Sequence, residues 1–151
     1  MREDDLINSI DTDAIEAAIA AAEKNCSGEI RVHIETTIGA HEIRSVGERV
    51  FQRLGMTKTK DRNGVLIFLA AEEQEFVILG DEGIHEKVGD EFWEHVAQEM
   101  TDHFRHGRFT GGLVAAIHEA GERLAEHFPY HHRDVDELKN AVSFGSSDEP
   151  R

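Results

Sequence analysis

Cysteine, long apolar stretches and an apolar leader are all missing or scarce in this sequence. Cys26 is the one cysteine among 151 residues, which excludes a disulfide within the chain and favours a structural role for the thiol. No stretch approaches the roughly 18 apolar residues that a membrane-spanning helix needs. Residues 1–5 carry no apolar segment of the kind found in secretory signals. We therefore expect a cytoplasmic protein without membrane insertion.

Basic residues are also scarce. The chain has 16 Lys and Arg against 31 Asp and Glu, a net charge of −15. Repulsion between like charges then opposes binding to nucleic acid or to an anionic membrane. The length fits a single domain, and a hydrophobic content of 39% is sufficient for a core. Nucleic acid is thus excluded as the expected partner.

Apolar patterns predict most of the secondary structure. Residues 29–37 alternate between apolar and polar side chains, which predicts a strand with one solvent-exposed face. Residues 65–69 are apolar throughout, which predicts a central strand, and residues 76–79 form its antiparallel partner. Residues 81–89 are expected to form a loop or a single helical turn. The predicted helices span residues 11–24, 41–54, 90–107 and 110–127.

The order of these elements is helix, strand, helix, strand, strand, helix, helix. The strand–helix–strand unit implies a right-handed crossover between parallel strands, and the hairpin adds an antiparallel strand. We predict an α/β fold, a three-layer α/β/α sandwich with a small mixed β-sheet flanked by helices. The folded domain is expected to span residues 1–128. Residues 129–151 should form an irregular C-terminal tail that docks in part, through residues such as Val135, Leu138, Val142 and Phe144, and is mobile from Ser146 on.

Acidic side chains flank both strands of the predicted hairpin. Asp61 and Asn63 precede the first strand, and Asp81 and Glu82 follow the second. Antiparallel pairing brings these segments to one edge of the sheet, where a parallel strand starting at Glu29 would also begin. Calcium takes carboxylate, amide and backbone oxygens, as does magnesium with stricter geometry. The sequence thus predicts a divalent-cation site at this edge, although Asx-Gly pairs are also ordinary turn formers.

Two further segments have alternative interpretations. Residues 104–112 are basic and glycine-rich before a helix, which suits either phosphate binding by Arg105 and Arg108 or, as we favour, a tight helix–helix connection. The ten histidines suggest a zinc site as another hypothesis, although their helical stripe lies opposite the apolar side and so fits an exposed face. The residues concerned are His95, Glu99, His103 and His106 on the stripe, and His127, His131 and His132 beyond it.

Four segments resemble the TPM domain, the module shared by thylakoid proteins of photosystem II repair and many bacterial proteins. The resemblance covers about residues 10–128 and implies an α/β/α sandwich, in agreement with the prediction above. The segments are Ser27-Gly28-Glu29-Ile30, Asp61-Arg62-Asn63-Gly64-Val65-Leu66-Ile67, Gly80-Asp81-Glu82-Gly83-Ile84, and the Phe104, Gly107, Phe109, Gly112 series.

The resemblance also implies calcium binding and an acid-phosphatase-like activity at an acidic cleft. Asp61, Asn63 and Asp81 match the cleft positions, which makes Asp61 and Asp81 the expected catalytic residues. Lys60 and Arg62 would hold the phosphate of a phosphorylated small molecule. Typical members carry a signal peptide and a membrane segment or glycine-rich tail, so this chain resembles a short soluble branch.

The complete predicted metal set includes two residues outside the family match. Glu29 matches less closely, and Glu82 follows from the expected geometry alone. No side chain is clearly activated as a nucleophile, which leaves a second interpretation open. In that alternative the chain is a non-catalytic protein-interaction or assembly module, and its ion is structural.

Overall fold

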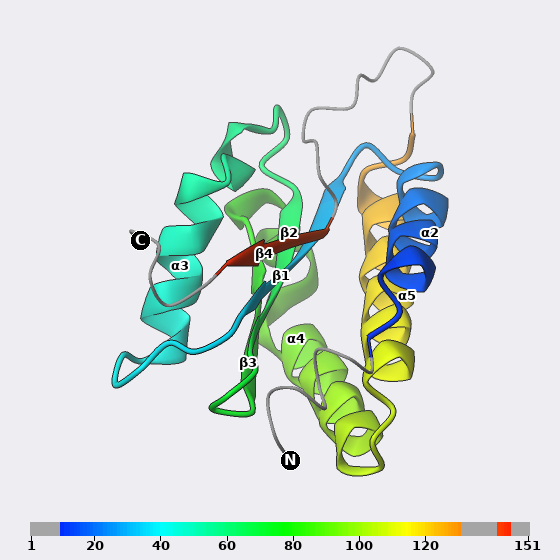
Figure 1. Ribbon diagram of the computed structural model, residues 1–151. Helices are drawn as coiled ribbons and strands as arrows, with labels where there is room; N and C mark the ends of the chain where they lie inside the picture. Colours follow the sequence, from blue (N-terminus) through cyan, green and yellow to red (C-terminus); the bar gives the residue numbers. More distant parts are fainter. Residues whose placement is uncertain (1–9, 131–141, 146–151) are drawn as a thin grey trace.

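The computed structural model of the protein describes residues 10–130 and 142–145 (Figure 1). Within these residues, the fold consists of four α-helices, one short 3₁₀ helix and a four-stranded sheet. In chain order the elements are α2 (Thr12–Glu23), β1 (Glu29–Glu35), α3 (Ile43–Arg53), the short 3₁₀ helix η1 (Met56–Lys58), β2 (Gly64–Ala70), β3 (Glu75–Gly80), α4 (Glu82–Arg105), α5 (Phe109–His127) and β4 (Val142–Gly145).

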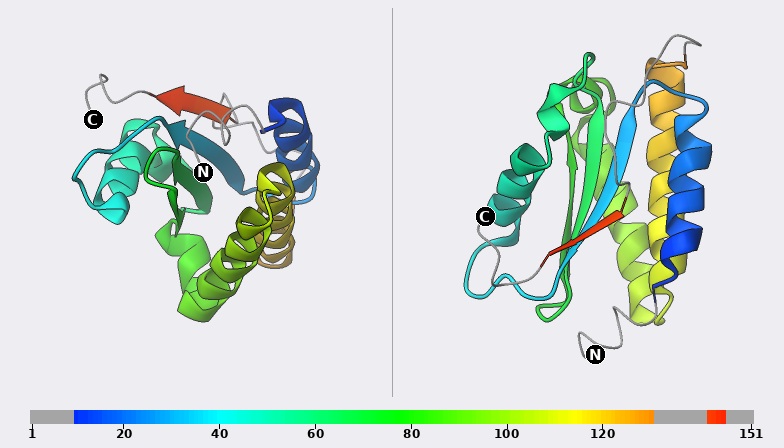
Figure 2. Two further views of the ribbon diagram at one scale, coloured as in Figure 1. Left: turned by 60° about the horizontal axis from the view of Figure 1, so that its bottom comes forward. Right: turned by 45° about the horizontal axis from the view of Figure 1, so that its top comes forward.

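The sheet is mixed, with the strand order β3-β2-β1-β4. Strand β1 runs parallel to both β2 and β4, whereas β2 and β3 form the antiparallel hairpin. Helix α3 covers one face of the sheet, and α2, α4 and α5 lie on the other (Figures 1 and 2). The predicted three-layer α/β/α arrangement is confirmed.

The continuously apolar strand β2 serves two cores at once. Val65, Ile67 and Leu69 pack with the buried faces of α2, α4 and α5. The alternate residues Leu66 and Phe68 pack on the other side against α3. Since side chains of a strand point to opposite faces in turn, a strand between two helical layers must be apolar at every position. Its central place was therefore predictable.

Helix α4 begins earlier than the sequence pattern indicated. The segment 81–89, expected as a loop or one turn, is helical from Glu82, and Asp81 caps it by accepting the Glu82 N–H through Oδ1 at 2.9 Å. At Gly89 the backbone leaves the helical conformation, with φ 76° and ψ 176°, and the axis kinks. Glycine tolerates positive φ without steric cost, so a single residue separates the two helical parts.

The C-terminal region adds a strand where an irregular tail was expected. Residues Val142–Gly145 form β4 at the edge of the sheet, paired with β1 from Val32 to Glu35. Phe144, expected to dock, is 52% exposed, whereas Val142 packs against the core. The remaining docking residues Val135 and Leu138, and the segment from Ser146 on, lie outside the described residues.

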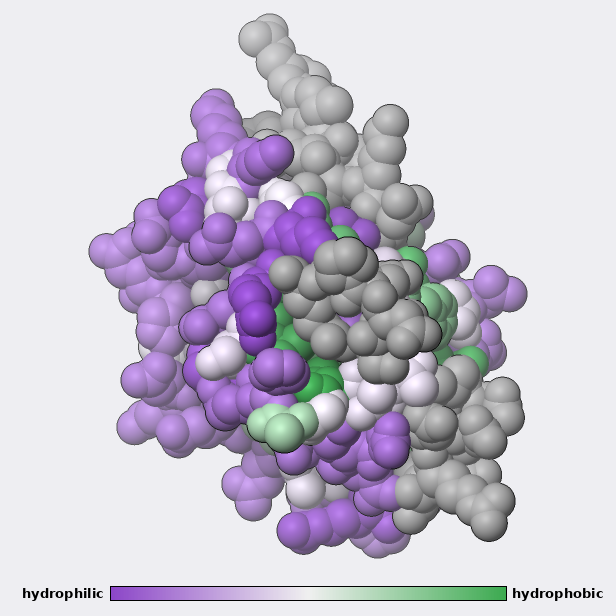
Figure 3. Space-filling model, turned by 60° about the vertical axis from the view of Figure 1, so that its left-hand side comes forward, coloured by the Kyte–Doolittle hydropathy of each residue, from purple (hydrophilic) through white to green (hydrophobic). Residues whose placement is uncertain are grey.

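The surface agrees with the charge of the chain. On the α3 side it is mostly hydrophilic, with small apolar areas near the centre and at the right-hand side of the view (Figure 3). Within residues 10–130 and 142–145, no helix combines the length and the apolar character needed to cross a membrane.

Strand β1 is buried on both faces, contrary to the expectation of one exposed face. All seven of its residues are buried, because it lies between β2 and β4 rather than at the edge. Its polar side chains lie on the α3 side, where Arg31 Nη1 donates to the Leu54 carbonyl and His33 contacts both Ser143 and Glu35. His33 Nδ1 lies 2.7 Å from Ser143 Oγ, and His33 Nε2 lies 3.1 Å from Glu35 Oε2. A Cβ at Gly145 would overlap the Glu35 carboxylate, so glycine is needed there.

The buried imidazole predicts a specific pH dependence. Burial lowers the pKa of His33 below its ordinary value, although Glu35 opposes the shift. The unfolded chain therefore takes up this proton at higher pH than the folded chain, which penalises folding as pH falls below the unfolded value of about 6.5. We expect the free energy of unfolding to decrease from about pH 7.5 to pH 5.5, and to decrease less in His33→Gln.

Urea denaturation across this pH range measures the slope. The exposed His118 supplies the control, since its side chain is 74% exposed, and His118→Gln should keep the wild-type slope. Equal slopes in wild type and His33→Gln would contradict the assignment.

Candidate cation-binding rim

One end of the sheet gathers the segments that the sequence singled out. Strands β1 and β2 begin side by side, with Glu29 paired to Gly64, and β3 ends at Gly80 opposite Val65. The segments before β1 and β2 and after β3 therefore meet at the upper end of the sheet in Figure 1. We define the rim as Ser27, Glu29, Asp61, Arg62, Asn63, Asp81 and Glu82.

Asn63 is the most constrained polar residue of the rim. It is 1% exposed, and its backbone N–H donates to Thr59 Oγ1 at 3.2 Å. Its side-chain Nδ2 donates to Ser27 Oγ at 3.2 Å. The amide oxygen Oδ1 is buried and accepts no hydrogen bond from any residue in the described part of the chain. A buried oxygen without a donor costs about 1–3 kcal/mol, so this atom is suited to a ligand.

Asp61 lies next to this amide and shares a neighbour with it. The Ser27 hydroxyl, which receives the Asn63 amide N–H, lies 3.5 Å from Asp61 Oδ2. One hydroxyl thus connects a carboxylate to a buried amide. The sequence did not indicate the rim contacts of Ser27, or the bond from the Asn63 backbone to Thr59 beside the rim, because neither residue is a usual cation ligand and both contacts depend on the turn geometry.

The Arg62 guanidinium forms an ion pair with the Asp81 carboxylate. Its Nε donates to Asp81 Oδ2 at 2.6 Å and its Nη2 to Asp81 Oδ1 at 2.9 Å, a two-point pairing of guanidinium and carboxylate. Nη1 reaches Glu82 Oε1 at 3.2 Å. The hydrogen bonds that Arg62 donates to Asp81 raise the pKa of Arg62 above its ordinary value. Arg62 adopts φ 52°, an unusual value for a residue with a side chain, which shows that the surrounding contacts impose its conformation.

Gly83 allows the two sides of the rim to touch. Its N–H donates to the Arg62 carbonyl at 2.8 Å. A Cβ there would overlap the Asp61 carbonyl oxygen and lie 2.6 Å from the Arg62 carbonyl oxygen. Only glycine therefore permits the start of α4 to pack on the turn that carries Asp61 and Arg62.

An open cleft of about 570 Å³ lies over the rim. The two predicted phosphate-binding residues, Lys60 and Arg62, border this cleft together with Asp61. Two positively charged side chains and one carboxylate therefore line the same cleft. The lining residues are Lys60, Asp61, Arg62, Glu82, Gly83, His85 and Glu86.

The predicted metal residues all lie at the rim, but they differ in solvent exposure and in their hydrogen-bond partners. Glu29 is buried at the start of β1, and Glu82 is 73% exposed and paired with Arg62. Within the described chain, the rim carboxylates do not form a group of three whose oxygens lie within 4.8 Å of one another. Asp61 borders the open cleft and Asn63 carries the buried oxygen without a donor among the described residues, whereas both oxygens of Asp81 accept hydrogen bonds from Arg62.

Two other features of the sequence, the histidine stripe on α4 and the glycine-rich segment 104–112, can also be located in the structure. His106 Nδ1 bonds to the Asp102 carbonyl at 2.8 Å, and His103 packs on α5, so neither extends a metal group along α4. Residues 104–112 form a tight helix–helix connection, in which a Cβ at Gly112 would lie 2.9 Å from the Phe104 ring. His131 and His132 lie outside the described residues.

Comparison with protein families identifies the class. The family model of the TPM domain matches residues 1–123, so the chain belongs to the TPM domain family. The residue patterns at the rim had indicated this family from the sequence alone.

Solved structures agree with the assignment. The chain is similar to the NMR structure of BA42 protein from the psychrophilic bacterium Bizionia argentinensis, with 42% identity, a TM-score of 0.80, and coverage of 90% of this chain and 95% of that chain. The N-terminal domain of a protein from P. gingivalis shares the fold at 21% identity and a TM-score of 0.64, covering 80% of this chain and 79% of that chain.

A third solved structure, the N-terminal domain of cg2496 protein from Corynebacterium glutamicum, shares the fold at 18% identity and a TM-score of 0.56. It covers 81% of this chain and 79% of that chain. No curated protein matched the sequence.

Proposed function

We propose that this TPM domain binds a divalent cation at the rim, with Asp61 and Asn63 as its principal ligands. The observation that carries the proposal is the buried Asn63 Oδ1, which has no donor among the described residues. An oxygen of this kind next to a carboxylate is the arrangement that a hard cation requires.

Calcium is the favoured ion. It accepts six to eight oxygen ligands in flexible geometry, including amide and carbonyl oxygens, whereas magnesium requires near-ideal octahedral geometry. The rim offers the exposed carboxylate of Asp61, the buried amide oxygen of Asn63 and an open cleft that admits water. This mixed and incomplete set suits the less demanding ion.

Arg62 sets the role of Asp81. Its guanidinium already neutralises the Asp81 carboxylate, so an ion that recruited Asp81 would have to displace the arginine. We assign Asp81 as the anchor of Arg62 in the ion-free protein, and as an additional ligand when Arg62 moves away. We assign Glu29, buried at the start of β1, and Glu82, exposed and paired with Arg62, as peripheral residues of the site.

Phosphomonoester hydrolysis is the second candidate function. It is supported by the cleft, in which Lys60 and Arg62 border the same space as Asp61. A bound cation would supply charge for a phosphate oxygen and activate water. The chain's own residues would then act by binding the phosphate with Lys60 and Arg62 and by accepting a proton at Asp61. The competing interpretation is an interaction or assembly module with a structural ion.

Thermal unfolding in EDTA, calcium and magnesium tests the cation site. A ligand that binds only the folded state stabilises it by about 2.7 kcal/mol at a hundredfold excess over its dissociation constant. We expect calcium to raise the melting temperature of the wild type more than magnesium does. The shift should be lost in the Asp61→Asn, Asn63→Ala double variant, which lacks the charged ligand and the amide oxygen.

Asp13→Asn is the matched control, because it removes one exposed carboxylate from α2 and should keep the calcium shift. A calcium shift that persists in the double variant would exclude Asp61 and Asn63 as the ligands. Hydrolysis of a phosphomonoester that requires both calcium and Asp61 would favour the enzyme over the interaction module.

A further inference from the structure

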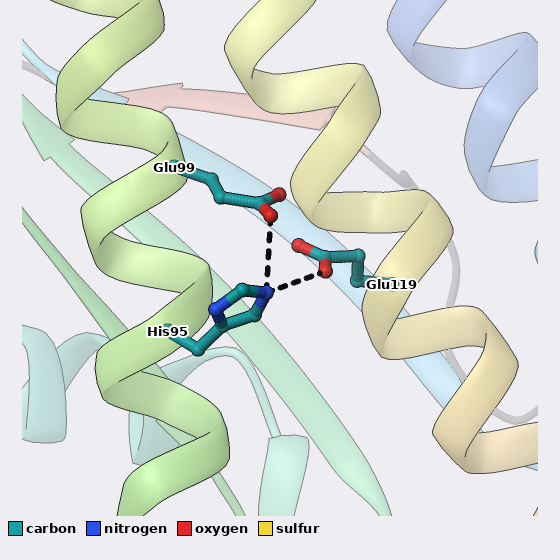
Figure 4. A group of neighbouring side chains, drawn as sticks. All are labelled: His95, Glu99 and Glu119. Atoms are coloured by element: carbon teal, nitrogen blue, oxygen red, sulfur yellow. Dashed lines mark ion pairs between the residues drawn. The ribbon is translucent and has the colours of Figure 1, made fainter.

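A second group of ligand-type side chains lies between α4 and α5, away from the rim. His95 and Glu99 come from α4 and Glu119 from α5, and one ligand atom of each lies within 4.8 Å of the others. His95 Nε2 is 3.0 Å from Glu99 Oε1 and 3.3 Å from Glu119 Oε1. Figure 4 shows the three side chains pointing toward one another across the space between the helices.

One oxygen of the Glu119 carboxylate lacks a hydrogen-bond donor among the described residues. Its Oε2 is buried and accepts no hydrogen bond from any residue that the structure describes. Burial and the adjacent Glu99 carboxylate raise the pKa of Glu119, while His95 opposes the shift. Two carboxylates held this close repel each other unless a proton or a cation lies between them. The site therefore favours positive charge independently of the His95 contacts.

We propose that His95, Glu99 and Glu119 bind a zinc-type divalent transition-metal ion. One imidazole nitrogen and two carboxylates provide three protein ligands, which leaves a fourth tetrahedral position for water. The imidazole distinguishes this group from the rim, where all candidate ligands are oxygens that suit calcium. Because α4 and α5 both contribute, the ion would cross-link two helices that are otherwise held together by packing and by the short connection between them.

The geometry also explains why His95, and not His103 or His106, belongs to the group. The sequence pattern does not distinguish among His95, Glu99, His103 and His106 as ligands, since all lie on one helical stripe. Only the first two face α5 at the level of Glu119, while His103 and His106 make the contacts described above. The third ligand thus comes from a different helix.

Zinc titration by calorimetry tests the proposal, using tag-free protein in which His127, His131 and His132 are replaced by glutamine to remove the other histidine cluster. We expect one zinc ion per chain, and affinity at least about tenfold weaker in His95→Ala and in Glu119→Gln. Cobalt substitution should give the visible absorption of a tetrahedral site, lost in both variants. Circular dichroism of each variant verifies that the fold is retained.

The His118–Glu122 pair provides a matched control. It places the same residue types four apart on α5, with Nε2 and Oε1 3.5 Å apart, but it is not part of a three-residue group among the described side chains. His118→Ala should leave zinc affinity unchanged, as should the rim variant Asp61→Asn, Asn63→Ala. Zinc affinity that is unaltered in Glu119→Gln, or the absence of stoichiometric zinc in the parent protein, would overturn the proposal.

Discussion

Replacing Arg62 with alanine is expected to have opposite effects on the ion-free and the calcium-bound protein. In EDTA the buried Asp81 carboxylate, 7% exposed, loses both guanidinium hydrogen bonds and retains the Glu82 N–H. Leaving a buried charged group without its partner should lower the free energy of unfolding by about 2–3 kcal/mol. With calcium, the freed carboxylate becomes available as a ligand, so the calcium-induced increase in stability should exceed that of the wild type.

Denaturant unfolding with and without calcium measures both effects. Arg123→Ala is the control, because Arg123 and Glu126 form an exposed pair on α5 whose loss should change stability by no more than about 1 kcal/mol. In an Asp81→Asn background, Arg62→Ala should cost much less, because the charge that it neutralises is gone. A calcium effect equal to that of the wild type would show that Asp81 takes no part in ion binding.

Gly83→Ala is expected to be among the most destabilising single-methyl substitutions in the chain. The new Cβ would overlap the Asp61 carbonyl oxygen and crowd that of Arg62, and backbone atoms cannot move aside as a flexible side chain can. Separating these segments also stretches the bond from the Gly83 N–H to the Arg62 carbonyl. We expect a loss of about 3 kcal/mol or more, together with the loss of calcium binding as the rim opens.

Gly111→Ala is a close control for this variant. Gly111 also lies in the first turn of a helix, but its Cβ would meet neighbours no closer than 3.5 Å. Alanine should therefore be neutral there or stabilise by up to about 1 kcal/mol. Differential scanning calorimetry compares the two variants, since 1 kcal/mol corresponds to about 2–4 °C for a chain of this size. Equal melting temperatures would refute the close approach at Gly83.

The convergence at the rim was predictable because strand pairing determines it. The register that places Gly80 opposite Val65 follows from a short hairpin, and the parallel start of β1 follows from the crossover through α3. Side-chain pairing was not predictable in the same way. Arg62 borders the cleft in which a phosphate was expected, but its pairing with the buried carboxylate of Asp81 was not indicated by the sequence.

Contacts between distant segments were the least accessible from the sequence. The polar residues of β1 read as a solvent-exposed face, because strand β4, which lies more than a hundred residues later, could not be recognised. Glu119 was not considered as a ligand, since its approach to His95 depends on how α4 and α5 pack. Both errors arise from tertiary packing rather than from local periodicity.

The break at Gly89 separates α4 into two mechanical units. The first has Asp81 as its N-cap and Glu82 at its start and contacts the rim, whereas the second carries His95 and Glu99 and packs along α5. A rotation of the short unit can be absorbed by the backbone of one glycine instead of being transmitted along a continuous helical rod. We therefore expect the two proposed ion sites, which lie on different units of α4, to bind independently, so that their binding free energies add.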